Sequence, residues 1–252
     1  MKGRPLVVGF NGSPRTYGNT FKTLRLALLA AEEEGVETKL VNLYEHDVRP
    51  CIACLTEDIT LCRYPCVIGD DMRRLYDLIL KAQAMIVATP IFWYNVSGVV
   101  KNFIDRLTVF ENMIHVEGRS WLEGKAAGFI AIGNDTGPIA VIQNLMATFN
   151  SMGVHVPPWA LAYYSGPGDV LEQENVVLDA ANLGWILARY AKAVSGSGQP
   201  GSLGYDAGEE ARKRARLLAS RVAREAEENR RRRNLLRLIN EQKAPDVNWV
   251  PG

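Results

Sequence analysis

Two features that would quickly narrow the function of a protein are missing from this sequence: a long apolar segment and a strong net charge. No apolar run approaches the length of a membrane span, and the N-terminus lacks the apolar region of a signal peptide. The 29 basic and 28 acidic residues give a net charge of +1, so composition offers no reason to expect nucleic acid or an anionic membrane. We therefore expect a cytoplasmic protein that binds neither membranes nor nucleic acid.

The loop that follows the first apolar run, residues 11–20, lacks the two glycine-rich motifs that are typical of nucleotide-binding loops. Its glycine spacing matches neither G-x-x-x-x-G-K-[ST] nor G-x-G-x-x-G, which argues against a nucleoside triphosphate loop and a dinucleotide fingerprint there. Histidine is scarce, and we assign none of His46, His115 and His155 to catalysis, because a lone histidine is more often a surface or packing residue. The scarcity of acid–base groups suits a reaction that a bound cofactor performs.

Apolar runs and amphipathic segments alternate along the first 160 residues. The sequence predicts strands at residues 5–10, 37–43, 84–89, 125–132 and 154–160, with helices at residues 20–34, 70–82, 99–107 and 140–152. Residues 110–124 are expected to be irregular. This alternation predicts an α/β fold in which one doubly wound, five-stranded parallel sheet carries helices on both faces. At 252 residues and 47% hydrophobic content, the chain can bury one such core.

The chain beyond residue 165 exceeds what a minimal domain of this kind needs. Residues 179–194 and 209–240 are expected to be helical, and residues 195–208 form a glycine- and serine-rich linker. We therefore divide the chain into a cofactor domain, residues 1–165, and a helical extension, residues 166–252. Its last helix and C-terminal arm are expected to hold a homo-dimer or homo-tetramer together. The cluster Arg230–Arg233 could bind nucleic acid or an acidic partner, but nearby glutamates favour a solvated or partner-packed helix.

The loop at residues 11–20 joins the first predicted strand to the first predicted helix. Backbone N–H groups and the positive end of the helix dipole converge there, which makes such a loop an anion site. Side chains of Ser13, Asn19 and Thr20 can add donors, and Arg15 adds a full charge. The alternative is an ordinary turn in which Asn19 serves only as a helix N-cap.

Two further loops follow buried strands and meet the same edge of the predicted sheet. Residues 90–97 include the consecutive aromatics Phe92, Trp93 and Tyr94, whose flat apolar groups suit a flat ligand or, alternatively, a packing contact. Residues 133–137 form a small turn rich in glycine and polar residues. Ligands of doubly wound sheets bind at such carboxyl ends of strands.

All four cysteines lie in the long segment 44–70, between the second strand and the second helix. Cys51, Cys54, Cys62 and Cys66 are spaced C-x₂-C-x₇-C-x₃-C, and four thiolates in so short a span can converge on one metal centre. The residues alone leave three possibilities open: an iron–sulfur cluster, a structural zinc, or thiols without a metal.

The stretch Gly12-Ser-Pro-Arg15 followed by Gly18-Asn-Thr20 resembles the phosphate loop of flavodoxin-like FMN reductases and iron–sulfur flavoproteins. Residues 89–97, followed by Lys101 and Asp105-Arg106, resemble the stretch that lines the isoalloxazine ring in those families, and the likeness extends over about residues 7–160. The resemblance implies FMN as cofactor and NAD(P)H as co-substrate. The resemblance and the three loops described above together predict the cofactor-binding residues. These are Ser13, Arg15, Gly18, Asn19, Thr20, Pro90, Ile91, Phe92, Trp93, Tyr94, Asn95, Gly133, Asn134, Asp135 and Gly137.

The cysteine segment resembles the cluster-bearing loop of iron–sulfur flavoproteins and is followed, as there, by Val-Ile and an acidic pair. It departs from their usual spacing, because residues 55–61 separate the second and third cysteines. The resemblance implies an FMN-dependent oxidoreductase that transfers electrons between NAD(P)H or a redox protein and a flavin, quinone or other small acceptor, with a possible [4Fe–4S] cluster. A plain reductase without a cluster and a flavodoxin-like electron carrier without substrate turnover are the alternatives. We assign Asp105-Arg106 to structure.

Overall fold

The computed structural model describes residues 4–135, 137–196 and 208–243, with side chains described as far as residue 237. Most of the predicted linker and the C-terminal arm beyond residue 243 lie outside the described residues.

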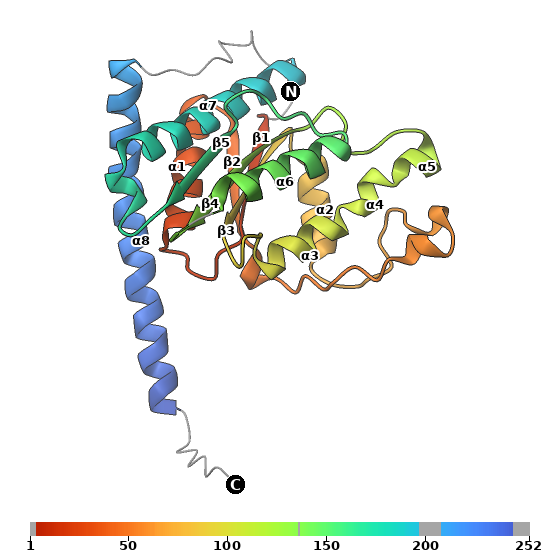
Figure 1. Cartoon of the computed structure of the whole chain (residues 1–252), viewed down its shortest axis with the longest axis horizontal. Helices are drawn as coiled ribbons and strands as arrows, with labels where there is room; N and C mark the ends of the chain where they lie inside the picture. The colour runs from red at the N-terminus through yellow and green to blue at the C-terminus, as the bar shows by residue number, and fades with distance from the viewer. Residues whose placement is uncertain (1–3, 136, 197–207, 244–252) are drawn as a thin grey trace.

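Five parallel strands form one sheet in the order β2-β1-β3-β4-β5 (Figure 1). The central strands β1 (Leu6–Asn11), β3 (Ala84–Pro90) and β4 (Ala126–Gly133) are almost wholly buried, as their continuous apolar runs predict. Strand β2 (Glu37–Asn42) lies at one edge and alternates between exposed and covered residues, and β5 (Leu161–Ser165) lies at the other. The predicted flavodoxin-like doubly wound fold is confirmed.

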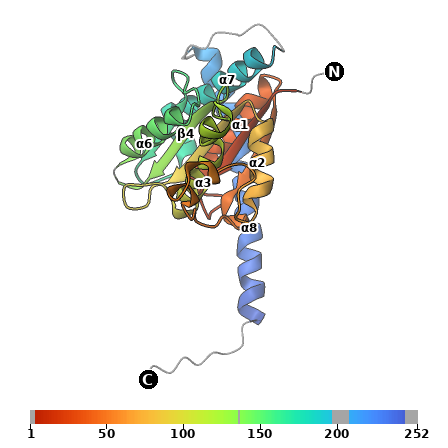
Figure 2. The same ribbon diagram turned by 90° about the vertical axis from the view of Figure 1, so that its right-hand side faces the viewer.

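Helices cover both faces of the sheet (Figures 1 and 2). One face packs against α1 (Asn19–Glu33) and α7 (Glu174–Ser195), and α8 (Glu209–Lys243) packs on the outside of these two helices. The other face packs against α2 (Met72–Lys81), α3 (Gly98–Arg106) and α6 (Pro138–Ser151). Because side chains alternate along each strand, Val7 joins the first core and Val8 the second.

The helical extension shares the core of the sheet domain. Helix α7 lies so close to α1 that a Cβ added at Gly184 would stand 2.0 Å from the carbonyl oxygen of Ala27, so this position requires glycine. The first half of α8 buries a stripe of small and aliphatic side chains against α1 and α7: Ala211, Ala215, Leu218, Ala219, Val222 and Ala226. Only the C-terminal end of α8 projects past the body of the molecule (Figures 1 and 2). Much of the expected oligomerisation helix therefore packs within its own chain.

Three predicted elements differ from the structure. The fifth strand was expected at residues 154–160, but β5 begins at Leu161, because Trp159 adopts a left-handed φ of 64° that ends the preceding segment in a turn. Helix α7 begins at residue 174 rather than 179, after the short helix η4 (Val170–Glu172). The segment 110–124, expected to be irregular, contains the end of α4 (Thr108–Glu111) and α5 (Met113–Glu117).

Candidate functional site

The loop between β1 and α1 is held in shape by its own side chains. The Asn11 carboxamide oxygen accepts the N–H of Ser13 at 3.1 Å, and the Ser13 hydroxyl accepts the N–H of Arg15 at 3.1 Å. The N-cap of α1 is Gly18, without a side-chain capping bond, so the alternative in which Asn19 caps the helix is wrong. No side-chain cap competes with an anion for the first N–H groups of α1.

The loop between β1 and α1, residues 12–18, is called the phosphate-type loop below, and it is hydrogen-bonded to β3 and to the loop that follows β3, residues 90–97. The Gly12 N–H donates to the carbonyl of Ala88 at 2.7 Å, and the buried hydroxyl of Ser97 donates to the Gly12 carbonyl at 2.8 Å. A Cβ at Gly12 would lie 2.1 Å from a methyl of Val100 and 2.9 Å from the Ala88 oxygen. The backbone of this loop therefore has no freedom to move toward β3.

A cleft of about 530 Å³ opens at the carboxyl ends of β1, β3 and β4, which is the size of a small-ligand site. It brings together eight of the predicted residues: Ser13, Arg15, Gly18, Asn19, Thr20, Pro90, Gly133 and Asn134. Six of the other seven, Phe92, Trp93, Tyr94, Asn95, Asp135 and Gly137, lie outside its walls. The seventh residue, Ile91, packs against Gly133, a wall residue of the cleft. A Cβ at Gly133 would lie 2.9 Å from Cδ1 of Ile91, so the second loop contacts the third at this point.

The aromatic residues form a tight two-residue turn. Phe92 and Asn95 exchange backbone hydrogen bonds of 2.9 and 3.1 Å, and the residues between them, Trp93 and Tyr94, adopt left-handed φ angles of 52° and 61°. Such conformations cost about 1–3 kcal/mol each in residues other than glycine and cluster at functional sites. Trp93 is 94% exposed, so no packing of its ring against the described residues explains the strain.

Replacing Trp93 with glycine is expected to raise the free energy of unfolding by about 1 kcal/mol, because glycine removes the strain at φ 52° and no buried contact is lost. Urea unfolding measures this change. Trp93→Ala is the matched control, since alanine also removes the ring but keeps a Cβ at the strained position. Equal stability of the glycine and alanine variants would contradict the strain.

The third loop adds backbone to the cleft wall and touches the aromatic turn. The Ile91 N–H donates to the Ile132 carbonyl at 2.9 Å, which extends the pairing of β3 and β4 to the edge of the cleft. Gly137 has a φ of 96°, and a Cβ there would lie 3.1 Å from the ring of Tyr94. The three loops thus form one continuous surface.

Several wall residues of the cleft were missed by the sequence reasoning. Lys22 pairs with Asp169 at 2.5 Å, and the Asn19 amide donates to the carbonyl of Gly168 at 2.8 Å, so the segment before η4 closes one side. Helix α8 supplies further wall residues, among them Glu227 and Arg230. The stripe of small and aliphatic residues along α8 could have predicted that this helix packs against the domain, but the many charged residues of α8 favoured a solvated helix.

The four cysteines line one small hollow, together with Arg106 and neighbouring residues of α3 and α4. The short helices η2 (Cys54–Thr56) and η3 (Ile59–Leu61) fold the seven intervening residues back on themselves. Ala53 adopts a left-handed φ of 52° and donates its N–H to the Cys51 sulfur at 3.4 Å. The unusual spacing is therefore compatible with convergence of the thiols.

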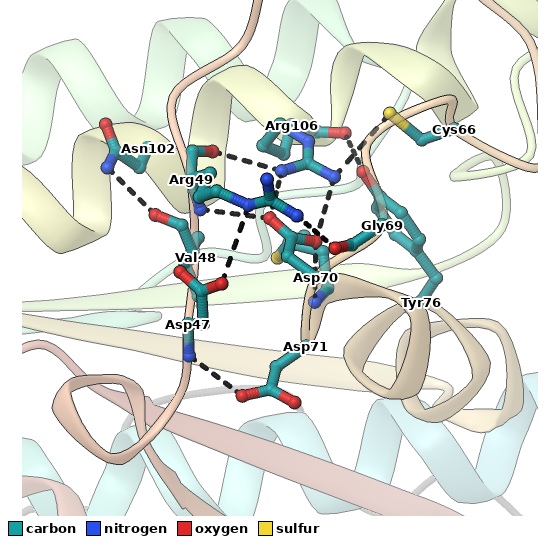
Figure 3. A network of polar contacts seen from close by, with 11 residues as sticks. Asp47, Val48, Arg49, Cys66, Gly69, Asp70, Asp71, Tyr76, Asn102 and Arg106 are labelled. Atoms are coloured by element: carbon teal, nitrogen blue, oxygen red, sulfur yellow. Dashed lines mark hydrogen bonds and ion pairs between the residues drawn. The ribbon is translucent and has the colours of Figure 1, made fainter.

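Arg106 connects the cysteine segment to the end of α3 (Figure 3). Its guanidinium forms an ion pair with Asp70 in which both side chains are wholly buried, with a shortest distance of 2.5 Å. It also donates to the Arg49 carbonyl at 3.0 Å and to the Cys66 sulfur at 3.6 Å. The prediction that Asp105-Arg106 is structural agrees with this geometry, although Asp105 itself pairs with Lys101.

The electrostatics of the cysteine hollow disfavour a free thiolate at Cys62. Burial, together with the nearby Cys54, Cys51 and Cys66, raises the pKa of the Cys62 thiol to about 12. Within the described residues, no group of three or more His, Cys, Asp or Glu side chains is already arranged to hold a metal ion. The donor set nevertheless matches a thiolate-bound centre, whose positive metal would reverse this repulsion.

A family model described as NADPH-dependent FMN reductase matches residues 5–165. The chain belongs to the NADPH-dependent FMN reductase family. An iron-sulfur flavoprotein from Archaeoglobus fulgidus is 32% identical over 168 residues, which cover 66% of this chain and 72% of that protein. An iron-sulfur flavoprotein from Methanocaldococcus jannaschii is 30% identical over 200 residues, which cover 75% of this chain and 98% of that protein.

A solved structure of RosB with bound 8-demethyl-8-formylriboflavin-5'-phosphate shares the fold, with a TM-score of 0.63 and 16% identity over 100% of this chain and 91% of that one. As a member of the NADPH-dependent FMN reductase family, the chain is an FMN-dependent NAD(P)H oxidoreductase, and such enzymes act on small-molecule electron donors and acceptors. In the part of the chain that the structure describes, no helix combines the length and apolar character of a bilayer-spanning segment.

Proposed function

We propose that this member of the family binds FMN in the cleft at the ends of β1, β3 and β4 and passes electrons from NAD(P)H to a flavin, quinone or other small acceptor. The observation that carries the proposal is the uncapped N-terminus of α1 beside Arg15 at the floor of that cleft. Backbone donors and a guanidinium together suit the phosphate of a mononucleotide.

The chain's own residues would position the cofactor. The first N–H groups of α1, with Ser13 and Thr20 beside them, would hold the phosphate, and the backbone of residues 90–95, 133–135 and 137 would lie along the ring. Bound FMN supplies hydride acceptance at N5 and electron transfer to the acceptor. Trp93 and Tyr94 are exposed in the turn of the same loop, where their rings would offer stacking surface to the second, exchanging substrate.

We propose further that Cys51, Cys54, Cys62 and Cys66 hold a [4Fe–4S] cluster, which supplies single-electron transfer when bound. Two features of the chain support it: the common hollow of the four thiols, and hydrogen bonds from the Ala53 N–H and the Arg106 guanidinium to cysteine sulfurs. Helix α3 runs from the aromatic loop to Arg106, so the two proposed redox sites would lie at opposite ends of a nine-residue helix. Zinc is the alternative occupant.

Steady-state oxidation of NADPH and NADH by the FMN-loaded protein, with ferricyanide or a quinone as acceptor, tests the proposed reaction. We expect turnover with at least one nicotinamide. A protein that holds FMN but oxidises neither nicotinamide would be an electron carrier instead.

Iron and acid-labile sulfide analysis tests the cluster. We expect both elements in protein prepared without oxygen, and their loss in Cys62→Ser, while FMN content stays unchanged. Arg15→Ala is the matched counterpart and should weaken FMN retention while iron remains. Zinc in place of iron and sulfide would contradict the cluster.

We also propose that the chain forms a homo-dimer or homo-tetramer through the projecting end of α8, where Leu235 and Leu236 are 59% and 60% exposed. The mass of the protein in solution tests this.

A further inference from the structure

Helix α8 lies across the phosphate-type loop, although it is about 200 residues away in sequence. The Asn229 amide donates to the Thr16 carbonyl at 2.9 Å, and the Arg233 guanidinium donates to the Pro14 carbonyl at 3.0 Å. The same guanidinium lies over the Tyr17 ring, 5.6 Å from its centroid. One face of α8 is thus fitted to the loop that is expected to hold the cofactor phosphate.

Arg230 lies on that side of α8 and lines the cleft together with Arg15. Its guanidinium is paired with Glu227, also a wall residue, at 2.7 Å, and Glu227 pairs with Arg231 at 3.1 Å as well. The Arg230 and Glu227 side chains are 56% and 39% exposed, so the pair is weak and its partners can exchange.

The charges around the cleft leave two cations for an anion. The ammonium of Lys22 is already neutralised by Asp169 at 2.5 Å. Arg15 has no carboxylate partner among the described residues, and Arg230 has one only through the exposed Glu227. Two guanidiniums therefore face the same cavity, one from the loop and one from α8. A phosphate dianion accepts several hydrogen bonds from such groups, whereas a neutral alcohol does not.

We propose that Arg230 is a phosphate-binding residue of the flavin site, supplied by α8, and that Glu227 holds it at the cleft wall until the phosphate takes the place of the carboxylate. This residue lies outside the segment 5–165 that the family model matches. The inference rests on the proposed FMN function and deepens it. It gives the enzyme a preference for FMN over riboflavin that the loop alone would supply less strongly.

Binding of FMN and of riboflavin to apoprotein, measured by quenching of flavin fluorescence, tests the role of Arg230. We expect Arg230→Ala to weaken FMN binding about tenfold or more and to leave riboflavin binding unchanged, because only the phosphate contact is lost. Arg230→Lys should recover part of the affinity for FMN. Glu227→Gln should tighten FMN binding several-fold, since it removes the competing carboxylate.

Arg232→Ala is the matched control, because Arg232 is an exposed arginine of the same helix that does not line the cleft. We expect it to bind both flavins as the wild type does. Equal FMN affinity of Arg230→Ala and the wild type would overturn the assignment, and so would a parallel loss of FMN and riboflavin, which would indicate that Arg230 only docks the helix. If the wild type binds no flavin, the proposed function fails and the assignment falls with it.

Discussion

Replacing Asp70 with alanine is expected to lower the free energy of unfolding by about 3–5 kcal/mol, because it leaves the buried Arg106 guanidinium without its countercharge. Both side chains of this pair are wholly shielded from solvent. Burial is the largest single effect and lowers the pKa of Arg106, but the hydrogen bonds that Arg106 donates to Asp70, together with its charge interactions with neighbouring groups, raise the pKa overall, so the guanidinium stays charged. Urea unfolding monitored by circular dichroism measures the change.

Asp105→Ala is the control for the Asp70 variant. Asp105 pairs with Lys101 one helical turn away, and the two side chains are 39% and 58% exposed, so its loss should cost only about 0.3–0.5 kcal/mol. Similar destabilisation by the two variants would contradict the role of the buried pair.

The contribution of Asp70 should depend on pH in a defined direction. Burial alone would raise the pKa of Asp70, but the hydrogen bonds of Arg106 and of the backbone N–H groups of Arg49 and Met72 hold it below its ordinary value. A depressed carboxyl pKa stabilises the folded state fully above the unfolded value of about 4, and this contribution is lost as the pH falls through the folded pKa. The stability gap between the wild type and Asp70→Asn should therefore be constant from pH 7 to 5 and narrow below about pH 4.

Replacing Gly12 with alanine is expected to weaken FMN binding by about tenfold to a hundredfold, because the new methyl group has no space without a shift of the loop. It would lie 2.1 Å from the buried, β-branched side chain of Val100 and 2.9 Å from the Ala88 carbonyl oxygen. The displaced loop would also lose the bond from Ser97 to the Gly12 carbonyl. Fluorescence titration with FMN measures the loss.

Gly98→Ala provides the comparison, since a Cβ at Gly98 meets nothing within 4 Å and alanine suits the first turn of α3. This variant should fold and bind FMN as the wild type does. A Gly12→Ala variant with wild-type affinity would show that the loop is not held as tightly as the contacts with β3 indicate.

The fold could be predicted from the sequence where burial on both faces requires a continuous run of apolar residues. Strands β1, β3 and β4 are covered on both faces, so their apolar runs were located to within a residue or two. Edge strand β5 was missed, because Ala162 is its one buried residue and the chain enters it through the strained Trp159. An edge strand with so little burial leaves almost no periodic signal.

The parts of the candidate site that backbone loops form could be predicted from the sequence. The phosphate-type loop and residues 133–134 follow from strand-to-helix junctions, which are local in sequence. The wall formed by α8 was not predictable in the same way, because Asn229 and Thr16 meet only through the docking of α8 on α1, two hundred residues apart. The hollow that the four cysteines share depends likewise on the two short helices that fold residues 54–61.

The most direct test of the account is the flavin content of the protein purified without oxygen and then extracted. We expect about one FMN per chain, with the flavin absorbance bands near about 370 and 450 nm. Riboflavin or FAD in place of FMN would contradict the phosphate site that Arg15 and the N-terminus of α1 form, and a colourless protein that takes up no added FMN would contradict the account as a whole.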